Sequence, residues 1–321
     1  MRKQNIIHSF ALNNNENTPQ CTVNGKAPTN NECSTSERNT LNNNKEYTFE
    51  FCIFSKLNGG SSDGGAISFT GNVQQTSMSL KISSSTFSDC SAKEGGAIHA
   101  STIQKIIVTQ SFFLRCSSSN TADNTGGGGI NTENINMKIS ISNNTFISCT
   151  AKASGASIFI HSSSADTMKL DAISNCRFLS CRSLEGTPDG AGVCVWGTEE
   201  LIGVKDSLFS LCSALYGGAI FYFLNDYWRS TFPIRYCLLN KNSAFWGSDV
   251  AICNYIPKTE PDEYALLFHC FSTSDSYRMG YYYSSTWYRT DADWFSLGTV
   301  KVKVYLYSHL HVLSMDMQYY H

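Results

Sequence analysis

The chain has 321 residues, and its 24 basic and 26 acidic side chains give a formal net charge of −2. This balance excludes the basic stripe typical of nucleic-acid-binding proteins, so we expect no nucleic-acid partner. No run approaches the roughly 18 apolar residues of a membrane helix, so we expect no membrane-spanning segment.

Residues 1–46 are rich in asparagine and show little apolar periodicity. We expect them to form a leader or an irregular N-terminal cap. Met1–Leu12 is too short and too polar to contain the apolar core of a secretion signal. No signal peptide or anchor is visible, which indicates a fragment, a diverged gene model or a chain that is not secreted.

Residues 47–252 contain an internal repeat of about 30 residues, built on two motifs. One is Phe-x-x-Cys, and the other is Gly-Gly-Ala-Ile, which is intact at Gly64–Ile67, Gly95–Ile98 and Gly217–Ile220. A large apolar residue anchors each repeat, at successive spacings of 33, 26, 33, 32, 31 and 30 residues. The anchors are Phe54, Phe87, Phe113, Phe146, Phe178, Phe209 and Leu239.

Another apolar residue stands five positions before every anchor, although the loops around it vary in length. These residues are Phe49, Ile82, Val108, Ile141, Ile173, Val204 and Ile234. Apolar and polar residues alternate around them, as in Leu80-Lys81-Ile82, which is typical of a strand. The pattern predicts an all-β fold, a parallel β-helix (β-solenoid) of about seven or more rungs stacked about 4.8 Å apart.

Stacking of the repeats would align the residues that recur in each repeat into ladders. We expect the aromatic anchors to point inward and stack, and the small glycines to allow a sharp turn. The predicted structural ladder consists of Phe87, Phe113, Phe146, Phe178, Phe209, Cys90, Cys116, Cys149, Cys181, Cys212, Gly64, Gly65, Gly95, Gly96, Gly217 and Gly218.

The 13 cysteines allow three interpretations. Side chains in a parallel, in-register stack run alongside each other, so we expect the ladder cysteines to be buried free thiols. A disulfide-stapled secreted solenoid is an alternative, because neighbouring rungs bring the Cα atoms within disulfide range. A metal site is disfavoured, because no Cys-x-x-Cys occurs. Cys21 and Cys33, outside the repeat, are the best candidates for a local bridge.

Residues 253–321 are rich in tyrosine and tryptophan. We expect one or two diverged rungs and an aromatic C-terminal cap that covers the last rung. An aromatic platform for sugar or protein is the alternative. Val300, Val302, Val304 and Leu306 alternate with polar or aromatic residues, which predicts a half-buried strand.

Phe-x-x-Cys-x-Ala followed by Gly-Gly-Ala-Ile resembles the repeats of the polymorphic outer-membrane proteins of chlamydiae. Cys mostly replaces the Asn of their Phe-x-x-Asn motif, and Leu239-x-x-Asn242 keeps the Asn form. The cysteine version is similar to β-helix surface proteins of parasitic protists, trichomonads above all. Over residues 49–252 the resemblance implies a right-handed, pectin-lyase-like β-helix, a cell-surface or extracellular location and a role in adhesion.

Right-handed β-helices include polysaccharide lyases and hydrolases, but the sequence lacks their motifs. Asn131-Thr132-Glu133 comes nearest to one of them and has no partner motif, and no acidic cluster is evident. Asp63, Glu94 and Asp189 each precede a glycine turn, where we expect solvated side chains or, as the alternative, weak Ca²⁺ binding. His99 and His161 lack a catalytic partner in sequence, so we expect them on the surface.

We therefore expect no catalytic residue, no cofactor and no metal, and a non-enzymatic monomer that presents its faces to an unknown protein or glycan ligand. The most variable loops, Cys116–Gly126 and Arg182–Asp189, are the predicted binding segments. A polysaccharide-active lyase or hydrolase is one alternative. A truncated family member without a function of its own is another.

Overall fold

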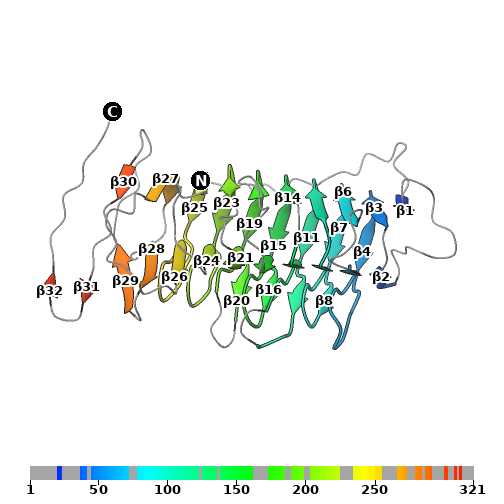
Figure 1. Cartoon of the computed structure of the whole chain (residues 1–321), viewed down its shortest axis with the longest axis horizontal. Helices are drawn as coiled ribbons and strands as arrows, with labels where there is room; N and C mark the ends of the chain where they lie inside the picture. The colour runs from blue at the N-terminus through cyan, green and yellow to red at the C-terminus, as the bar shows by residue number, and fades with distance from the viewer. Residues whose placement is uncertain are drawn as a thin grey trace, which may run out of the picture.

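The computed structural model describes residues 20–23, 37–41, 45–71, 78–122, 125–135, 138–161, 173–184, 189–198, 203–224, 234–254, 266–272, 279–283, 286–290, 300–302, 307–308 and 311–312. Within these residues every regular element is a β-strand. The strands stack side by side along one long axis (Figure 1). The chain is an all-β solenoid with parallel sheets, as the repeat predicted, and it has about 6 turns where about seven or more were expected.

Each rung begins with two strands separated by a corner at a residue such as Ser84, the first corner of the rung, and these strands form two parallel stacks. The first stack contains β3 (Glu46–Glu50), β6 (Ser79–Ser83), β10 (Lys105–Thr109), β14 (Lys138–Ser142), β18 (Ile173–Ser174), β22 (Val204–Lys205) and β25 (Ile234–Asn240). The second contains β4 (Ile53–Ser55), β7 (Thr86–Ser88), β11 (Phe112–Leu114), β15 (Thr145–Ile147), β19 (Arg177–Leu179), β23 (Leu208–Ser210) and the end of β25. Because β25 pairs with both stacks, they form one 16-stranded sheet, which also includes β1 (Gln20–Val23), β27 (Leu266–Ser272) and β30 (Val300–Val302).

Two further sheets complete the rungs. The short four-stranded sheet contains β8 (Ser91–Ala92), β12 (Ser117–Ser118), β16 (Thr150–Ala151) and β20 (Arg182–Ser183). The ten-stranded sheet contains β2 (Asn39–Leu41), β5 (Ile67–Thr70), β9 (Ile98–Ser101), β13 (Ile130–Glu133), β17 (Ile158–His161), β21 (Val193–Thr198), β24 (Ile220–Leu224), β26 (Val250–Asn254), β28 (Met279–Tyr283) and β29 (Thr286–Thr290). Each rung passes through the two stacks, the short sheet and then the ten-stranded sheet.

The anchor residues stack in register through the core. Phe54 pairs with Phe87, and the pairing continues rung by rung to Leu239. Neighbouring rings have centroids 4.4–5.0 Å apart and planes within 11° of parallel. The apolar residues five positions earlier pair in the same way, from Phe49 with Ile82 to Val204 with Ile234. These two columns lie in the buried core, together with inward-facing residues of the ten-stranded sheet such as Ile98 and Ile158.

Three corners of each rung adopt the left-handed backbone conformation, and Thr102 and Asn134 add a fourth such residue to their rungs. Two of them use non-glycine residues, such as Ser84 and Asp89, with φ between 48° and 58°. The third always uses glycine, such as Gly95 at φ 57°. A Cβ on Gly95 would overlap with the carbonyl of Ile98, so this turn excludes any side chain, whereas the other two corners leave room for one. The strict glycine motif therefore marks the tightest corner.

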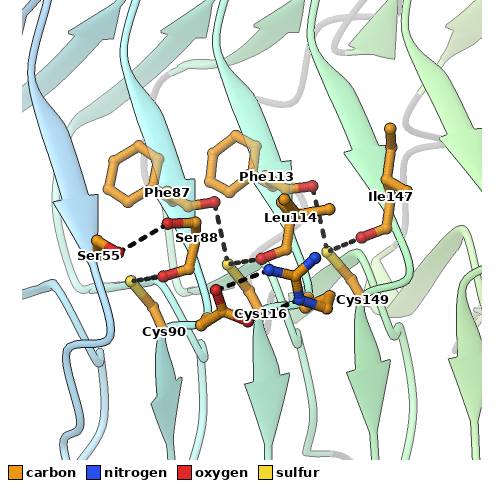
Figure 2. Close-up of polar contacts among 11 residues, drawn as sticks. Ser55, Phe87, Ser88, Cys90, Phe113, Leu114, Cys116, Ile147 and Cys149 are labelled. Atoms are coloured by element: carbon orange, nitrogen blue, oxygen red, sulfur yellow. Dashed lines mark hydrogen bonds and ion pairs between the residues drawn. The ribbon is translucent and has the colours of Figure 1, made fainter. Parts of the chain in front are cut away.

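The ladder cysteines follow the second corner and point inward. Each Sγ lies 3.6–3.8 Å from the carbonyl oxygen of the anchor residue in the preceding rung, as Cys116 does from Phe87 and Cys149 from Phe113 (Figure 2). A second carbonyl, two residues before each cysteine, also accepts from the thiol. Ten cysteines, the five ladder cysteines among them, are buried and free, which confirms the thiol interpretation for these ten.

A second buried column follows the first corner, two residues before each anchor. It consists of Cys52, Ser85, Ser111, Asn144, Cys176, Ser207 and Cys237. Their side chains form hydrogen bonds with the backbone of the preceding rung. For example, the Ser111 backbone N–H donates to Asn144 Oδ1 at 2.8 Å. The sequence analysis did not recognise this column, because its residue type changes from rung to rung.

The ends of the repeat show further strands. β2 lies within the segment expected to be a leader or cap, and it pairs in parallel with β5. β1 (Gln20–Val23) pairs antiparallel with β3. At the other end β27 (Leu266–Ser272) and β28 continue the parallel stacks.

Antiparallel pairs follow at the C-terminal end: β29 lies against β28, and β30 (Val300–Val302) against β27. β31 (Tyr307–Ser308) pairs with β32 (His311–Val312). Val304, Leu306, Cys33 and the side chains of the Tyr/Trp cluster lie outside the described residues, so the aromatic cap and the Cys21–Cys33 bridge stay predictions.

Candidate functional site

The glycine corner folds its preceding residue over the outer face of the ten-stranded sheet. The turn is so tight that Asn131 Nδ2 lies 3.4 Å from the carbonyl oxygen of Gly126, five residues earlier. Each residue before the glycine therefore stands close to the strand residue five positions later. The corner column comprises Asp63, Glu94, Gly126, Ser154, Asp189, Tyr216 and Trp246. The strand column comprises Ser68, His99, Asn131, Phe159, Cys194, Phe221 and Ala251.

The N-terminal half of this face carries a cluster of ionisable groups. One atom each from Glu94, His99 and Glu133 lie within 4.8 Å of one another. Glu94 and His99 come from one rung, and Glu133 ends β13 in the next rung, opposite Ser101. Carboxylate and imidazole are groups that bind divalent cations or hydrogen-bond to polar ligands.

Two asparagines hold Glu94 in place. Asn131 Nδ2 donates to Glu94 Oε2 at 3.0 Å, and Asn120 Nδ2 donates to Glu94 Oε1 at 2.7 Å. Asn120 belongs to the loop Cys116–Gly126, one of the two predicted binding segments. That loop therefore reaches the cluster, whereas residues 185–188 of the second predicted segment lie outside the described residues.

Burial and charge crowding shape the acid–base properties of the cluster. Burial, together with the neighbouring Glu94 carboxylate, raises the pKa of Glu133 to about 7. Burial lowers the pKa of His99, although Asp63 and Glu94 oppose this effect. Burial also lowers the pKa of His161, which lies beside Glu133 on the next strand.

Several sequence expectations about these residues were wrong. His99 is only 5% exposed rather than on the surface, and Glu94 and Asp189 are 8% and 5% exposed rather than solvated. The physical reason is the tight glycine corner, which packs the corner column against the strand column. The expectation that the sequence holds no acidic cluster was also wrong, because stacking brings Glu94 and Glu133 together from residues 39 positions apart.

The C-terminal half of the same face is aromatic. Phe159, Cys194, Phe221, Ala251 and Cys253 form a buried cluster separate from the main core. Trp196 and Phe223, partly exposed, pack on it with ring centroids 4.1 Å apart and planes 5° from parallel. Tyr216 packs against the same cluster, and its neighbour Trp246 contacts the exposed ring of Phe245. One face therefore changes from polar to aromatic along the solenoid axis.

The sequence contained a signal for this face. The position before each glycine and the position five residues later are occupied by polar residues early in the repeat and mostly by aromatic or small apolar residues late in it. The sequence analysis recorded Asp63, Glu94, Asp189, His99, His161 and the tripeptide at Asn131 separately. It did not join them, because the repeat was aligned on its inward-facing residues.

The chain matches no family model, no curated protein and no solved structure at a significant level. Within the described residues no helix is long and apolar enough to span a membrane.

Proposed function

We propose that the chain is a non-enzymatic, monomeric, right-handed β-helix of the pectin-lyase-like type, located at the cell surface or secreted, and that it acts in adhesion by binding a glycan. The repeat motifs, which resemble those of chlamydial and protist surface proteins, support this assignment. The binding surface is the outer face of the ten-stranded sheet.

The stacked pair Trp196 and Phe223 carries this proposal. Both rings are partly exposed, and both are held rigidly by strand pairing and by the buried aromatic cluster beneath them. Flat aromatic rings offer large amphipathic contact areas, and rings fixed in advance lose little conformational entropy when a ligand binds. The apolar C–H face of a sugar ring fits such a surface.

The polar half of the face suits the hydroxyl groups of the same ligand. Glu133 and His161 are partly exposed on neighbouring strands, and they point to the same side of the sheet as Trp196 on the strand after them. Carboxylate and imidazole groups hydrogen-bond to hydroxyls.

Binding to a panel of immobilised neutral and uronic-acid polysaccharides tests the proposal. We expect the folded chain to bind at least one of them and Trp196→Ala to weaken that binding at least tenfold. Tyr236→Ala removes a 65% exposed aromatic ring from another sheet and should leave binding unchanged. Absence of binding to every polysaccharide, or equal loss in both variants, would overturn the proposed binding face.

Labelling of intact source cells with a membrane-impermeant biotin reagent tests the location. We expect peptides of this chain in the captured surface fraction or in the medium. Detection of the protein exclusively inside the cells would contradict the adhesion proposal.

A polysaccharide-active enzyme is the second candidate, because Glu94 and Glu133 bring two carboxylates together on the proposed glycan face. Glycoside hydrolysis requires two such groups. Release of reducing ends or unsaturated products from a bound polysaccharide, abolished by Glu133→Gln, would favour this function over simple binding. Glycan retention without turnover would favour the binding protein.

A further inference from the structure

The cluster of Glu94, His99 and Glu133 has the composition of a metal site. Two atoms that bind one cation at 2.0–2.4 Å can be separated by at most about 4.8 Å. The three donor atoms, one on each side chain, meet this limit in every pair. The donors are fixed by the fold, since Glu94 and His99 flank one glycine corner and Glu133 ends the neighbouring strand.

Unpartnered buried atoms at the same place give independent evidence. His99 is 5% exposed, and its Nδ1 has no hydrogen-bond partner. Asn131 is fully buried and bonded to Glu94 through Nδ2, yet its Oδ1 is also without a partner. Buried polar atoms are nearly always bonded, because an unpaired one is costly. A bound cation would give the cluster the positive partner that its buried acceptors lack.

The two carboxylates also lack a neutralising side chain. Within the described residues, neither Glu94 nor Glu133 forms an ion pair with a lysine or arginine. The nearby Arg38 guanidinium donates instead to the carbonyls of Asp63 and Gly64 and to the hydroxyl of Thr40. Glu94 is buried and Glu133 is partly exposed, and two adjacent carboxylates without a counterion repel each other.

We propose that Glu94, His99 and Glu133 bind a divalent first-row transition-metal ion, with Zn²⁺ as the expected species. The imidazole decides between classes of cation, because Ca²⁺ and Mg²⁺ take oxygen ligands whereas Zn²⁺ accepts nitrogen and carboxylate oxygen together. Asn131 and Asn120, which hold Glu94, act as supporting residues for its orientation. The proposal does not depend on glycan binding.

Calorimetric titration of the untagged, chelator-treated chain with Zn²⁺ tests this site. Accessible thiols are first alkylated under native conditions, so that cysteine binding does not contribute. We expect one Zn²⁺ per chain, at least tenfold weaker binding in Glu133→Gln and in His99→Gln, and no comparable affinity for Ca²⁺. Glu50→Gln is the matched control, since Glu50 is an acidic residue of another sheet paired with Lys81, and it should bind Zn²⁺ as the wild type does.

Each variant is compared with the wild type by circular dichroism and by its melting temperature without metal. Glu133 is partly exposed, so Glu133→Gln is expected to fold even if His99→Gln does not. Zn²⁺ should raise the melting temperature of the wild type and not that of Glu133→Gln. No Zn²⁺ uptake by the folded wild type, unchanged affinity in folded Glu133→Gln, or preference for Ca²⁺ would overturn the proposal.

Discussion

Asn242 Oδ1 accepts a hydrogen bond from the backbone N–H of Cys212 at 3.0 Å. Its Nδ2 donates at 3.2 Å to the carbonyl of Phe209, the anchor of the preceding rung. In the five earlier rungs a thiol fills this place and donates to the equivalent carbonyl. Asn offers a strong donor and a strong acceptor, and Cys offers a weak one of each. The shared geometry explains how Cys can replace Asn at this corner.

Substitution of a ladder cysteine by asparagine should therefore be tolerated. We expect the free energy of unfolding of Cys149→Asn to lie within about 1 kcal/mol of the wild-type value, because the new amide reaches the same carbonyl of Phe113. Cys149→Asp has nearly the same shape but places an unpaired charge against carbonyl oxygens, and it should lose about 3–5 kcal/mol. Urea unfolding at pH 7 measures both. Similar losses of stability in the two variants would show that side-chain shape, rather than hydrogen bonding, decides which residue type is tolerated at this position.

The corners differ in their tolerance of a side chain. We expect Gly95→Ala to destabilise the fold by about 2 kcal/mol or more, since its Cβ would overlap with the Ile98 carbonyl at a positive φ. Ser84→Ala is the matched control, because Ser84 already carries a Cβ at φ 48°, and it should change stability by less than about 0.5 kcal/mol. Thermal and urea unfolding of the two variants give the comparison. Equal stability of both would refute the proposed corner clash.

Alkaline pH should weaken the fold through its buried thiols. Burial raises the pKa of Cys176 to about 12, whereas an unfolded cysteine titrates near 8.5. The unfolded state therefore releases protons first, and stability falls as pH rises from about 8.5 to 12, by up to about 1.4 kcal/mol per pH unit for each such thiol. Free energies of unfolding at pH 7, 9 and 10 test the slope.

Cys176→Ser provides the control for the pH effect. Serine occupies the equivalent position in three other rungs, at Ser85, Ser111 and Ser207, so the variant should fold. Its stability should decline less steeply with pH than that of the wild type. An identical slope in both chains would mean that Cys176 ionises equally in the folded and unfolded states.

The inward-facing residues made the fold predictable. Phe87, Phe113 and their copies recur at one fixed offset from the apolar residue five positions earlier, and only stacked rungs satisfy that pattern at variable loop lengths. The buried polar column at Ser85 and Asn144 escaped prediction because three residue types fill it. All three residue types can form a hydrogen bond with the backbone of the preceding rung.

The candidate site was less predictable because it forms between rungs. Glu94 and Glu133 are neighbours only after the chain has completed a full turn, and the turn lengths vary. A surface interpretation of His99 followed from its isolation in sequence. Its burial depends on Glu94 being folded back over the sheet by Gly95, a consequence of one backbone angle rather than of composition.

The uniform phenylalanine column and the variable column beside it solve different parts of the folding problem. A chain that skipped one whole rung would still place phenylalanine on phenylalanine. That column therefore stabilises the stack but does not specify the order of its rungs. The neighbouring column changes its residue type at every rung after Ser111, where Asn144 lies between Ser111 and Cys176. Skipping a rung would bring different polar partners together there. The variable positions thus distinguish one rung from the next, and they disfavour stacking of the rungs in the wrong order.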